Sequence, residues 1–455
     1  MDFLRIFRVF RDKKLFMLQR FFRLKENNTD IKTEIMAGVT TFMTMSYIIF
    51  VQPTVLSACG MDFGSVLVAT CVASALATLL MGVYANYPIA LAPGMGQNFF
   101  FAYTVVIQMR IAWQTALGAV FISGALFLLL SLFGFREKLI DGIPSSLKEA
   151  IAVGIGLFVA MIGFQWSGVV VAQPSTVVGL GDLHSAPVLL SLFGFVLTAI
   201  LIVARVRGAL LWGILATALA GLPAGVVKYH GIVGPIPSVS PTLLKLDILG
   251  AFDLGLVSVV FVFFFLALFD SVGTFIGVSS QAGFLVNGKL PRAREALSTD
   301  AFGSVSGALL GTSTVTAYVE SAAGVAEGGR TGLANMITGL LMLAGLFLYP
   351  LSRMVGDGFR LPNGSQIYPV VAPALIIVGS MMLRNVTRIQ WGDATEAIPA
   401  FLTMAIMPFA FSITEGIAFG FISYSLLKIV TGRRREAHGL VHLFAALFII
   451  RYIFL

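Results

Sequence analysis

The sequence predicts an all-α, polytopic membrane protein, and three observations support this fold class. The chain has 455 residues, of which 58% are hydrophobic and 11% charged, and its mean hydropathy is +0.93. Apolar runs of roughly 20 residues, the length that an α-helix needs to cross a bilayer, recur along the chain. The regular alternation of polar and apolar residues that is typical of a transmembrane β-barrel is absent. We therefore expect a chain that crosses a membrane many times as helices.

The amino-terminal stretch, 1–33, is basic and amphipathic. Phe3 and Phe7 lie at helical spacing, with Arg5 and Arg8 beside them. Further Lys and Arg residues interrupt the apolar core that a signal peptide would need. The pattern favours a helix that lies along the cytoplasmic surface of the membrane. A partly disordered basic tail is the alternative.

About fourteen hydrophobic segments follow, two of which are broken. The broken segments, 88–108 and 313–328, are too polar for simple spanning helices, and each reads as a short extended strand followed by a short helix. A final apolar run, 439–455, is either a further span or an interfacial segment. The unbroken segments are predicted at 35–57, 64–84, 112–133, 147–163, 187–204, 208–227, 254–278, 301–311, 332–351, 370–383, 398–411 and 413–430.

The distribution of basic residues gives the expected orientation. With the amino terminus in the cytoplasm, most Lys and Arg residues fall in inner segments, which agrees with the positive-inside rule. The outer loops hold only Arg110, Lys228, Lys245, Arg353 and Arg360. We therefore expect a multi-pass protein of the cell membrane, plasma or inner, with a cytoplasmic amino terminus.

The two halves of the chain resemble each other. Pro187 and Pro399 each begin a short span that is followed by a glycine-containing span, and the two broken segments are separated by a similar offset. Since seven is an odd number, two repeats of seven spans have opposite orientations in the membrane. The pattern predicts the inverted-repeat architecture of many transporters.

Acidic residues within the apolar segments mark the candidate site. Asp270 stands near the middle of the segment at 254–278, where burying a lone carboxylate costs several kcal/mol. Glu320 begins the short helix of the second broken segment, where the helix dipole favours a negative charge. Each acid could instead bond only to neighbouring backbone. An ionisable group at membrane depth nevertheless favours a functional site.

The residues around these acids complete the predicted site. Asn98 is expected to start the short helix of the first broken segment, and the pseudo-symmetry predicts that it faces Glu320. Tyr318 lies two residues before Glu320 on an extended stretch, so both side chains point to the same side. Phe99 could stack on a flat ligand, although packing is the more ordinary role of a phenylalanine here. Glu327 is expected to be structural and to pair with Arg330.

This set of side chains suits a neutral, planar solute with N–H donors. Two carboxylates repel an anion but accept hydrogen bonds from such donors. A carboxylate that gains and loses a proton also couples transport to a proton gradient. Among the scattered Cys and His residues, none has the spacing of a metal site, and the sequence shows no nucleophile and base pair. We expect neither an enzyme nor a bound cofactor, and the basic balance is read as membrane topology rather than nucleic-acid binding.

Several motifs resemble a known family over almost the whole chain. The sequences TTFMTMSYIIFVQP, ALAPGMGQNFFFAY, ALFDSVGTFIGV, GTSTVTAYVESAAGVAEGGRTGL and ITEGIAFGFISY are similar to those of the AzgA-like purine permeases, a branch of the nucleobase–cation symporters. The resemblance implies a uracil-carrier-like fold, elevator-like movement and a homodimer formed through the gate domains. It implies a core domain at 34–134 and 250–352, a gate domain at 135–249 and 353–436, and a hydrophobic tail at 437–455.

The resemblance also implies roles for the site residues. Asp270 and Glu320 hold the purine and couple the proton, Asn98 supports them, and Tyr318 stacks on the base. Two departures lie close to the site: Gln52 stands where relatives usually have Asn, and Gln97-Asn98-Phe99 stands where they usually have Leu-Asn-Ala. These changes bear on which purine is preferred.

The expected function is therefore a symporter of purine nucleobases and protons, with hypoxanthine and guanine slightly ahead of adenine. Sodium stays open as the coupling ion. The alternatives are a carrier of another nucleobase such as uracil or xanthine, an anion exchanger of related architecture, and a passive channel. The acid pair argues against the anion exchanger, and the two broken segments argue against the channel.

Overall fold

The computed structural model describes residues 17–133, 144–173, 176–252, 257–285, 290–361 and 364–454. The amphipathic pattern around Phe3 and Phe7 lies outside these residues.

The first half contains α2 (Ile31–Met45), α3 (Ile48–Ser57), α4 (Phe63–Leu80), the π-helix η1 (Met81–Ala85), α5 (Met95–Phe99), the π-helix η2 (Phe100–Gln108), α6 (Trp113–Phe133), α8 (Ser145–Trp166), α9 (Ala186–Val203) and α10 (Ala209–Gly221). The second half contains η3 (Gly250–Phe252), α11 (Val257–Ala282), α12 (Ala293–Leu310), α13 (Ser321–Ala326), α14 (Gly332–Ala344), η5 (Gly345–Leu348), α15 (Tyr349–Gly356), α16 (Ala372–Met382), η6 (Leu383–Arg388), α17 (Ala394–Phe409), α18 (Ile413–Val430), η7 (Arg434–Glu436) and α19 (Gly439–Phe454).

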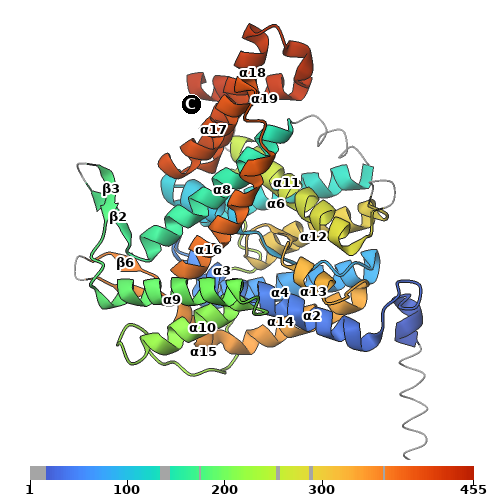
Figure 1. Cartoon of the computed structure of the whole chain (residues 1–455), viewed down its shortest axis with the longest axis vertical. Coiled ribbons are helices and arrows are strands. Elements are labelled where there is room, and N and C mark those ends of the chain that lie inside the picture. The colour runs from blue at the N-terminus through green and yellow to red at the C-terminus, as the bar shows by residue number, and fades with distance from the viewer. Residues whose placement is uncertain are drawn as a thin grey trace, which may run out of the picture.

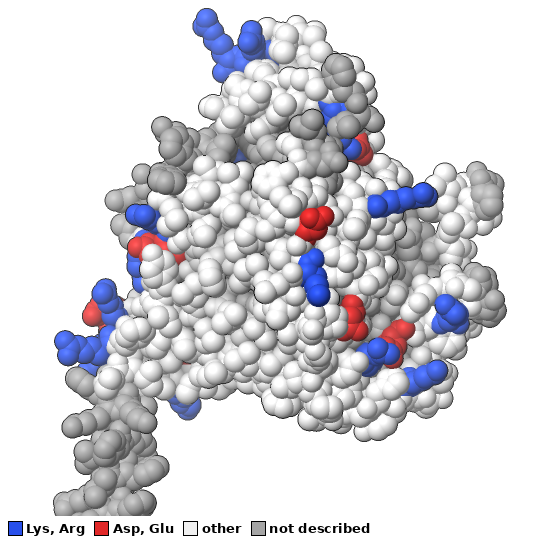
Figure 2. Space-filling view, turned by 180° about the vertical axis from the view of Figure 1, so that it is seen from behind, with Lys and Arg blue, Asp and Glu red and all other residues white. Residues whose placement is uncertain are grey.

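The structure is a multi-helix membrane protein, as predicted. Eight helical stretches in the described part of the chain are long and apolar enough to cross a bilayer. Figure 2 shows a broad surface on which charged side chains are sparse, as expected for a face in contact with lipid. The largest error in a predicted boundary is at α12, which begins at Ala293 rather than near 301. Its first turns carry polar residues such as Glu295 and Asp300, which a search for apolar runs does not include.

The helices pack in two groups. Helices α2, α4, α6, α12 and α14 pack around one another, with α3, α11 and α13 against them. Helices α8, α9, α16, α17 and α18 form the second group, and α10 packs on α9. In Figure 1, α17, α18 and α19 lie together at the end of the molecule farthest from α10 and α15.

Three short antiparallel sheets of two strands each complete the described fold. Strand β1 (Leu91–Pro93) pairs with β4 (Val315–Ala317), and the register places Ala92 opposite Thr316. Strands β2 (Val170–Gln173) and β3 (Val177–Leu180) form an exposed hairpin, and β5 (Phe359–Arg360) pairs with β6 (Gln366–Ile367). The first sheet joins segments more than two hundred residues apart, so it holds the two broken segments together.

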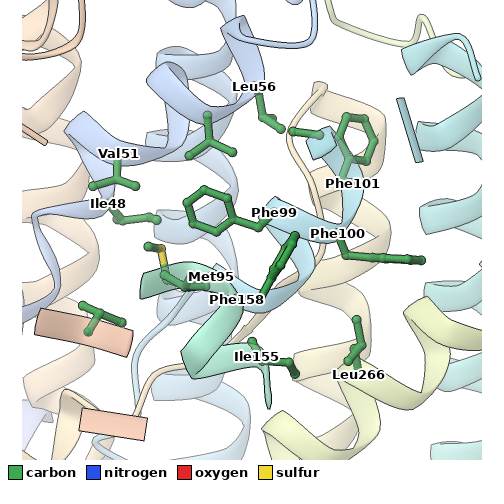
Figure 3. Close-up of a cluster of buried hydrophobic side chains, with 14 of the residues drawn as sticks. Ile48, Val51, Leu56, Met95, Phe99, Phe100, Phe101, Ile155, Phe158 and Leu266 are labelled. Atoms are coloured by element: carbon green, nitrogen blue, oxygen red, sulfur yellow. The ribbon is translucent and has the colours of Figure 1, made fainter. Parts of the chain in front are cut away.

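The hydrophobic core extends to the broken segments. Phe99, Phe100 and Phe101 are fully buried and pack among aliphatic and aromatic side chains of several helices (Figure 3). Close packing of this kind holds the short helix α5 in place. A five-residue helix has few hydrogen bonds of its own, so its position depends on these contacts.

Helix α19, which contains the final apolar run, packs against α18. Arg451 pairs with Glu415 at 2.9 Å, and His442 Nδ1 lies 2.7 Å from the Ser425 hydroxyl. These pairs place the end of α19 beside the start of α18, so the two helices are antiparallel. Phe444 of α19 also contacts Phe261 of α11, with ring centroids 4.5 Å apart. The run is therefore a helix packed along α18 rather than a detached segment.

Candidate functional site

The paired strands bring the two short helices α5 and α13 to one place. The Gly94 N–H donates to the Thr314 carbonyl and the Tyr318 N–H to the Ala90 carbonyl, both at 2.9 Å, which extends the ladder at its two ends. Helix α5 begins directly after β1, and α13 begins four residues after β4. The backbone polar groups of both breaks are thus satisfied within the protein, as a chain at membrane depth requires.

Glu320 is the N-cap residue of α13, as the sequence predicts. The Tyr47 hydroxyl donates to Glu320 Oε1 at 2.7 Å, and the Thr44 hydroxyl lies 3.3 Å from the Glu320 carbonyl oxygen. Tyr47 is fully buried at the break between α2 and α3. The carboxyl group is therefore held in a defined orientation by a neutral donor.

Asp270 lies near the middle of α11 and faces the broken segments. The Gln97 amide nitrogen Nε2 donates to Asp270 Oδ2 at 3.2 Å. Asp270 is exposed, whereas Gln97 is 1% exposed. Gln97 follows β1, and Glu320 follows β4, the strand paired with β1, so both acids lie at the paired broken segments.

The other predicted residues lie behind these acids. Asn98 is fully buried, bonds to the Ser313 hydroxyl, and donates to the Pro93 carbonyl at 3.3 Å. The prediction that Asn98 starts the short helix is wrong: α5 begins at Met95, and Asn98 is its fourth residue. The Tyr318 hydroxyl donates to the same Pro93 carbonyl at 2.6 Å. Asn98 and Tyr318 thus fix the turn between β1 and α5.

Two predicted aromatic positions differ in their surroundings. The ring of Tyr318 lies 6.4 Å from the ring of Tyr47, which bonds to Glu320, so Tyr318 stands close to the acids. Phe99 is fully buried and stacks on Tyr103 at 5.9 Å, inside the cluster of Figure 3. In this structure the core, rather than the open side of the site, surrounds Phe99.

The predicted pair of Glu327 and Arg330 is wrong. Glu327 Oε1 lies 2.7 Å from Arg207 Nη2, just before α10. The Arg330 guanidinium donates instead to the carbonyls of Val325 and Gly329, at 2.8 and 2.7 Å. The chain turns sharply after α13, so the Arg330 side chain folds back onto the carboxyl end of that helix and Glu327 points away toward α10.

One face of α11 is open beside the acids. Asp270, Gly273, Gly277 and Ser280 are exposed along this face. A Cβ atom added at Gly273 or Gly277 would meet nothing within 4 Å. The open face therefore extends from Asp270 toward the carboxyl end of α11.

Aromatic residues close a different side of the first broken segment. Trp166, at the end of α8, donates from Nε1 to the Tyr103 hydroxyl at 2.7 Å. Tyr368 packs on Trp166 at 4.3 Å, and Phe411 lies 6.2 Å from Tyr103. These contacts join η2 of the first helix group to elements of the second group.

Three residues of the site were not singled out as such from the sequence. Tyr47 lies in the hydroxyl-rich run TTFMTMSY, whose polarity inside a predicted span is a detectable signal. Gln97 was noted only as a departure from relatives. Asp300 is fully buried in α12, where it bonds to the Ser271 hydroxyl and accepts from the Ala317 N–H at 2.9 Å, so it braces β4 next to Asp270.

The chain matches known transporters in sequence and in fold. It is 47% identical to the adenine permease AdeP of Escherichia coli over 96% of each chain, and 44% identical to the guanine/hypoxanthine permease PbuG of Bacillus subtilis, covering 96% of this chain and 100% of that one.

Solved structures share the fold at low identity. The transmembrane domain of the cyanobacterial bicarbonate transporter BicA has a TM-score of 0.63 at 13% identity, with 84% of this chain and 97% of that chain covered. The murine anion transporter Slc26a9 in its inward-facing state has a TM-score of 0.61 at 10% identity, with 88% and 68% covered. At such identities the likeness shows the fold alone.

The family assignment rests on most of the chain. The Permease family matches residues 32–419, which include both broken segments and α11. The relatives at 44% identity and above are permeases and not enzymes. The chain therefore belongs to the permease family that contains these purine permeases.

Proposed function

We propose that the protein is a secondary active transporter that imports purine nucleobases by proton symport. The observation that carries this proposal is that one sheet joins the two helix breaks, one of which carries Glu320 while the other holds Asp270 of α11 through Gln97. Each carboxyl group accepts a hydrogen bond from a neutral donor, Gln97 or Tyr47. The names of the relatives, adenine and guanine/hypoxanthine permeases, support a purine as the substrate.

The chemistry of the site fits this solute. A purine is flat and neutral and presents ring and exocyclic N–H groups, which carboxylates accept. The broken helix α13 begins at Glu320, so the positive end of the helix dipole lies at this acid. Proton uptake by one of the two acids would then accompany substrate binding, and Asp270 and Glu320 are the candidates for this coupling.

The proposed mechanism is elevator-like alternating access. The helix group that includes α2, α4, α11, α12 and α14 would be the core that carries the site, and the group around α8, α9, α16, α17 and α18 would be the gate.

In this proposal the fold contains fourteen membrane segments in two inverted repeats of seven, with the amino terminus in the cytoplasm of a cell-membrane protein. A homodimer through the gates belongs to the same proposal. The open face of α11 then leads from Asp270 toward the cytoplasm.

Radiolabelled uptake tests the proposal directly. Cells that lack purine uptake of their own and express the full chain should accumulate guanine, hypoxanthine or adenine, and a protonophore should abolish accumulation. Replacing sodium by choline tests the other coupling ion. Accumulation that survives the protonophore contradicts proton symport, and absence of uptake of every purine contradicts the substrate class.

Two variants test the site within this assay. Asp270→Asn and Glu320→Gln should each lower the initial rate at least tenfold while the protein still reaches the membrane. Asp182→Asn, which changes an exposed acid after the β2–β3 hairpin, is the matched control. Normal transport by both site variants would refute the assignment of the acids.

A further inference from the structure

In the described contacts, Asp270 has one side-chain hydrogen-bond partner, the neutral amide of Gln97. Gln97 lies in the third position of α5, three residues after Gly94, and is 1% exposed. An ionised carboxylate only accepts hydrogen bonds, so the amide must turn its NH2 group toward Asp270. This contact fixes the orientation of the Gln97 amide, with Nε2 toward Asp270 and Oε1 at the other end.

The acceptor end of the same amide has no protein partner. Gln97 Oε1 is buried and has no hydrogen bond in the described part of the chain. It lies over Gly94, where an added Cβ atom would fall 2.2 Å from it, so this position of the amide depends on glycine at 94. A buried acceptor without a donor is unfavourable until a donor arrives. A ligand N–H placed beside Asp270 could supply one.

We infer that Gln97 selects purines that carry an exocyclic amino group; the inference rests on the proposed function and narrows its substrate class. Asp270 and Gln97 Oε1 are neighbouring acceptors, so together they fit an edge of the base with two neighbouring N–H donors. Guanine has such an edge, formed by its ring N1–H and its 2-amino group. Adenine has one in the tautomer with a proton on N7, beside its 6-amino group.

Hypoxanthine lacks this edge. Its N1–H lies between a carbonyl oxygen and a C–H group, and in the N7–H tautomer the neighbouring group is again the carbonyl. When Asp270 binds such an N–H, the group that faces Gln97 Oε1 is either a C–H, which leaves Oε1 without a donor, or the carbonyl oxygen of the base, which repels Oε1. A site whose buried acceptor matches a substrate N–H discriminates against an analogue that lacks it.

Gln97 could alternatively act only by orienting Asp270, and the two roles predict different results. A residue that only orients Asp270 would affect all purines equally when it is replaced. A residue that reads the amino group would change the ratio between purines. The ratio of inhibition constants for guanine and hypoxanthine, and for adenine and hypoxanthine, therefore separates the two roles.

Competition against radiolabelled uptake by the full chain is the test. In the wild type, guanine and adenine should compete roughly five- to tenfold better than hypoxanthine, and in Gln97→Leu and Gln97→Met the ratio should fall toward one. Gln108→Leu is the control, because Gln108 bonds to the Ala410 carbonyl away from the acids.

Each outcome is decisive. Equal competition by the three bases in the wild type overturns the inference, whether or not the variants fold. An unchanged ratio in Gln97→Leu and Gln97→Met, or an equal loss for all purines, also overturns it. In each of these outcomes the wild type still takes up purines, so the proposed function stands. Absence of all purine uptake by the wild type would instead contradict the proposed function.

Discussion

Each of the two acids accepts a hydrogen bond from one neutral side chain. In the described contacts, neither acid has a Lys or Arg partner. Glu320 accepts from the Tyr47 hydroxyl and Asp270 from the Gln97 amide. A Lys or Arg beside either acid would favour its charged form strongly and oppose protonation. Neutral donors orient a carboxyl group and still allow it to exchange a proton. This choice of partners suits the proposed proton symport, in which an acid binds and releases a proton in each cycle.

Replacing Tyr47 by Phe should lower the initial rate of purine uptake about tenfold, because one buried hydrogen bond to a charged group is lost while the ring remains. The measurement is uptake normalised to the amount of protein in the membrane. Tyr452→Phe is the matched control, since Tyr452 bonds to Glu415 in the first turn of α18. An unchanged rate for Tyr47→Phe would contradict the role given to this hydroxyl.

Asp270 and Glu320 could be singled out from sequence because carboxylates inside apolar runs are costly and therefore rare. Their partners could not be identified in this way. Tyr47 is separated from Glu320 by 273 residues, and only the packing of α13 on α2 brings the two together. The mistaken pairing of Glu327 with Arg330 has the same cause, since nearness along the chain does not give the direction of a side chain after a tight turn.

At the scale of elements, α13 depends on a close approach to α2. Gly324 faces α2 so closely that an added Cβ atom would lie 2.1 Å from Thr41 Oγ1 and 2.6 Å from the Ala37 carbonyl oxygen. A helix of six residues cannot hold its own position, and this contact fixes it. Small residues at helix contacts are the usual means of close packing in membranes.

Gly324→Ala should therefore destabilise the protein by about 1–3 kcal/mol, the usual cost of overpacking. We expect a lower melting temperature in detergent and weaker uptake. Gly439→Ala at the start of α19 is the control, because a Cβ atom there meets nothing within 4 Å. Equal melting temperatures for the two variants would show that α13 tolerates displacement.

The start of α17 gives a prediction about pH. Hydrogen bonds from the Thr395 hydroxyl and backbone N–H, and from the Arg433 guanidinium, lower the pKa of Asp393 to about 2 from its usual 3.8. A pKa that is lower in the folded state stabilises the fold above about pH 4. This stabilisation is lost as the pH falls toward about 2.

Asp393→Asn keeps an N-cap acceptor but removes the charge. The melting temperature of the wild type should exceed that of Asp393→Asn near neutral pH, and the difference should shrink as the pH falls from about 4 to about 2. A difference that does not change with pH would mean that charge plays no part at this helix start.

Most elements could be predicted because hydrophobic runs of helical length are a strong signal, and α18 spans 413–430 as expected. The breaks were predicted from small and polar residues in the two short segments. A short strand in each broken segment is also predicted, but the pairing of β1 with β4 is not. Its register depends on contacts between distant segments, which the local sequence does not contain.

At the scale of the whole molecule, the contacts around Trp166 join the two helix groups. Tyr103 belongs to the first group, while Trp166 and Tyr368 lie in or beside the second. The open face of α11 and this closed aromatic cluster lie on different sides of the site. In the proposed mechanism, the aromatic cluster would close one side of the site and the open face of α11 would give access from the other.

Trp166→Ala should open the closed side. With Phe99→Cys as a reporter, in a background of Cys59→Ser and Cys71→Ser, the rate of labelling by an impermeant maleimide added outside intact cells should rise several-fold, because Phe99 packs behind Trp166 and Tyr103. Trp166→Phe, which keeps a ring, should show a smaller increase. Equal labelling with and without Trp166 would contradict the idea that this cluster closes the outer side.

The sheet formed by β1 and β4 has a thermodynamic consequence. Gln97 and Glu320 follow the two strands of one ladder, and Gln97 holds Asp270, so the binding groups form a single rigid unit. A site that keeps its shape while its access changes has the same dissociation constant toward either compartment. In the proposed symport, net accumulation then reflects the gradient of the coupled ion, and reversing that gradient reverses the direction of net transport.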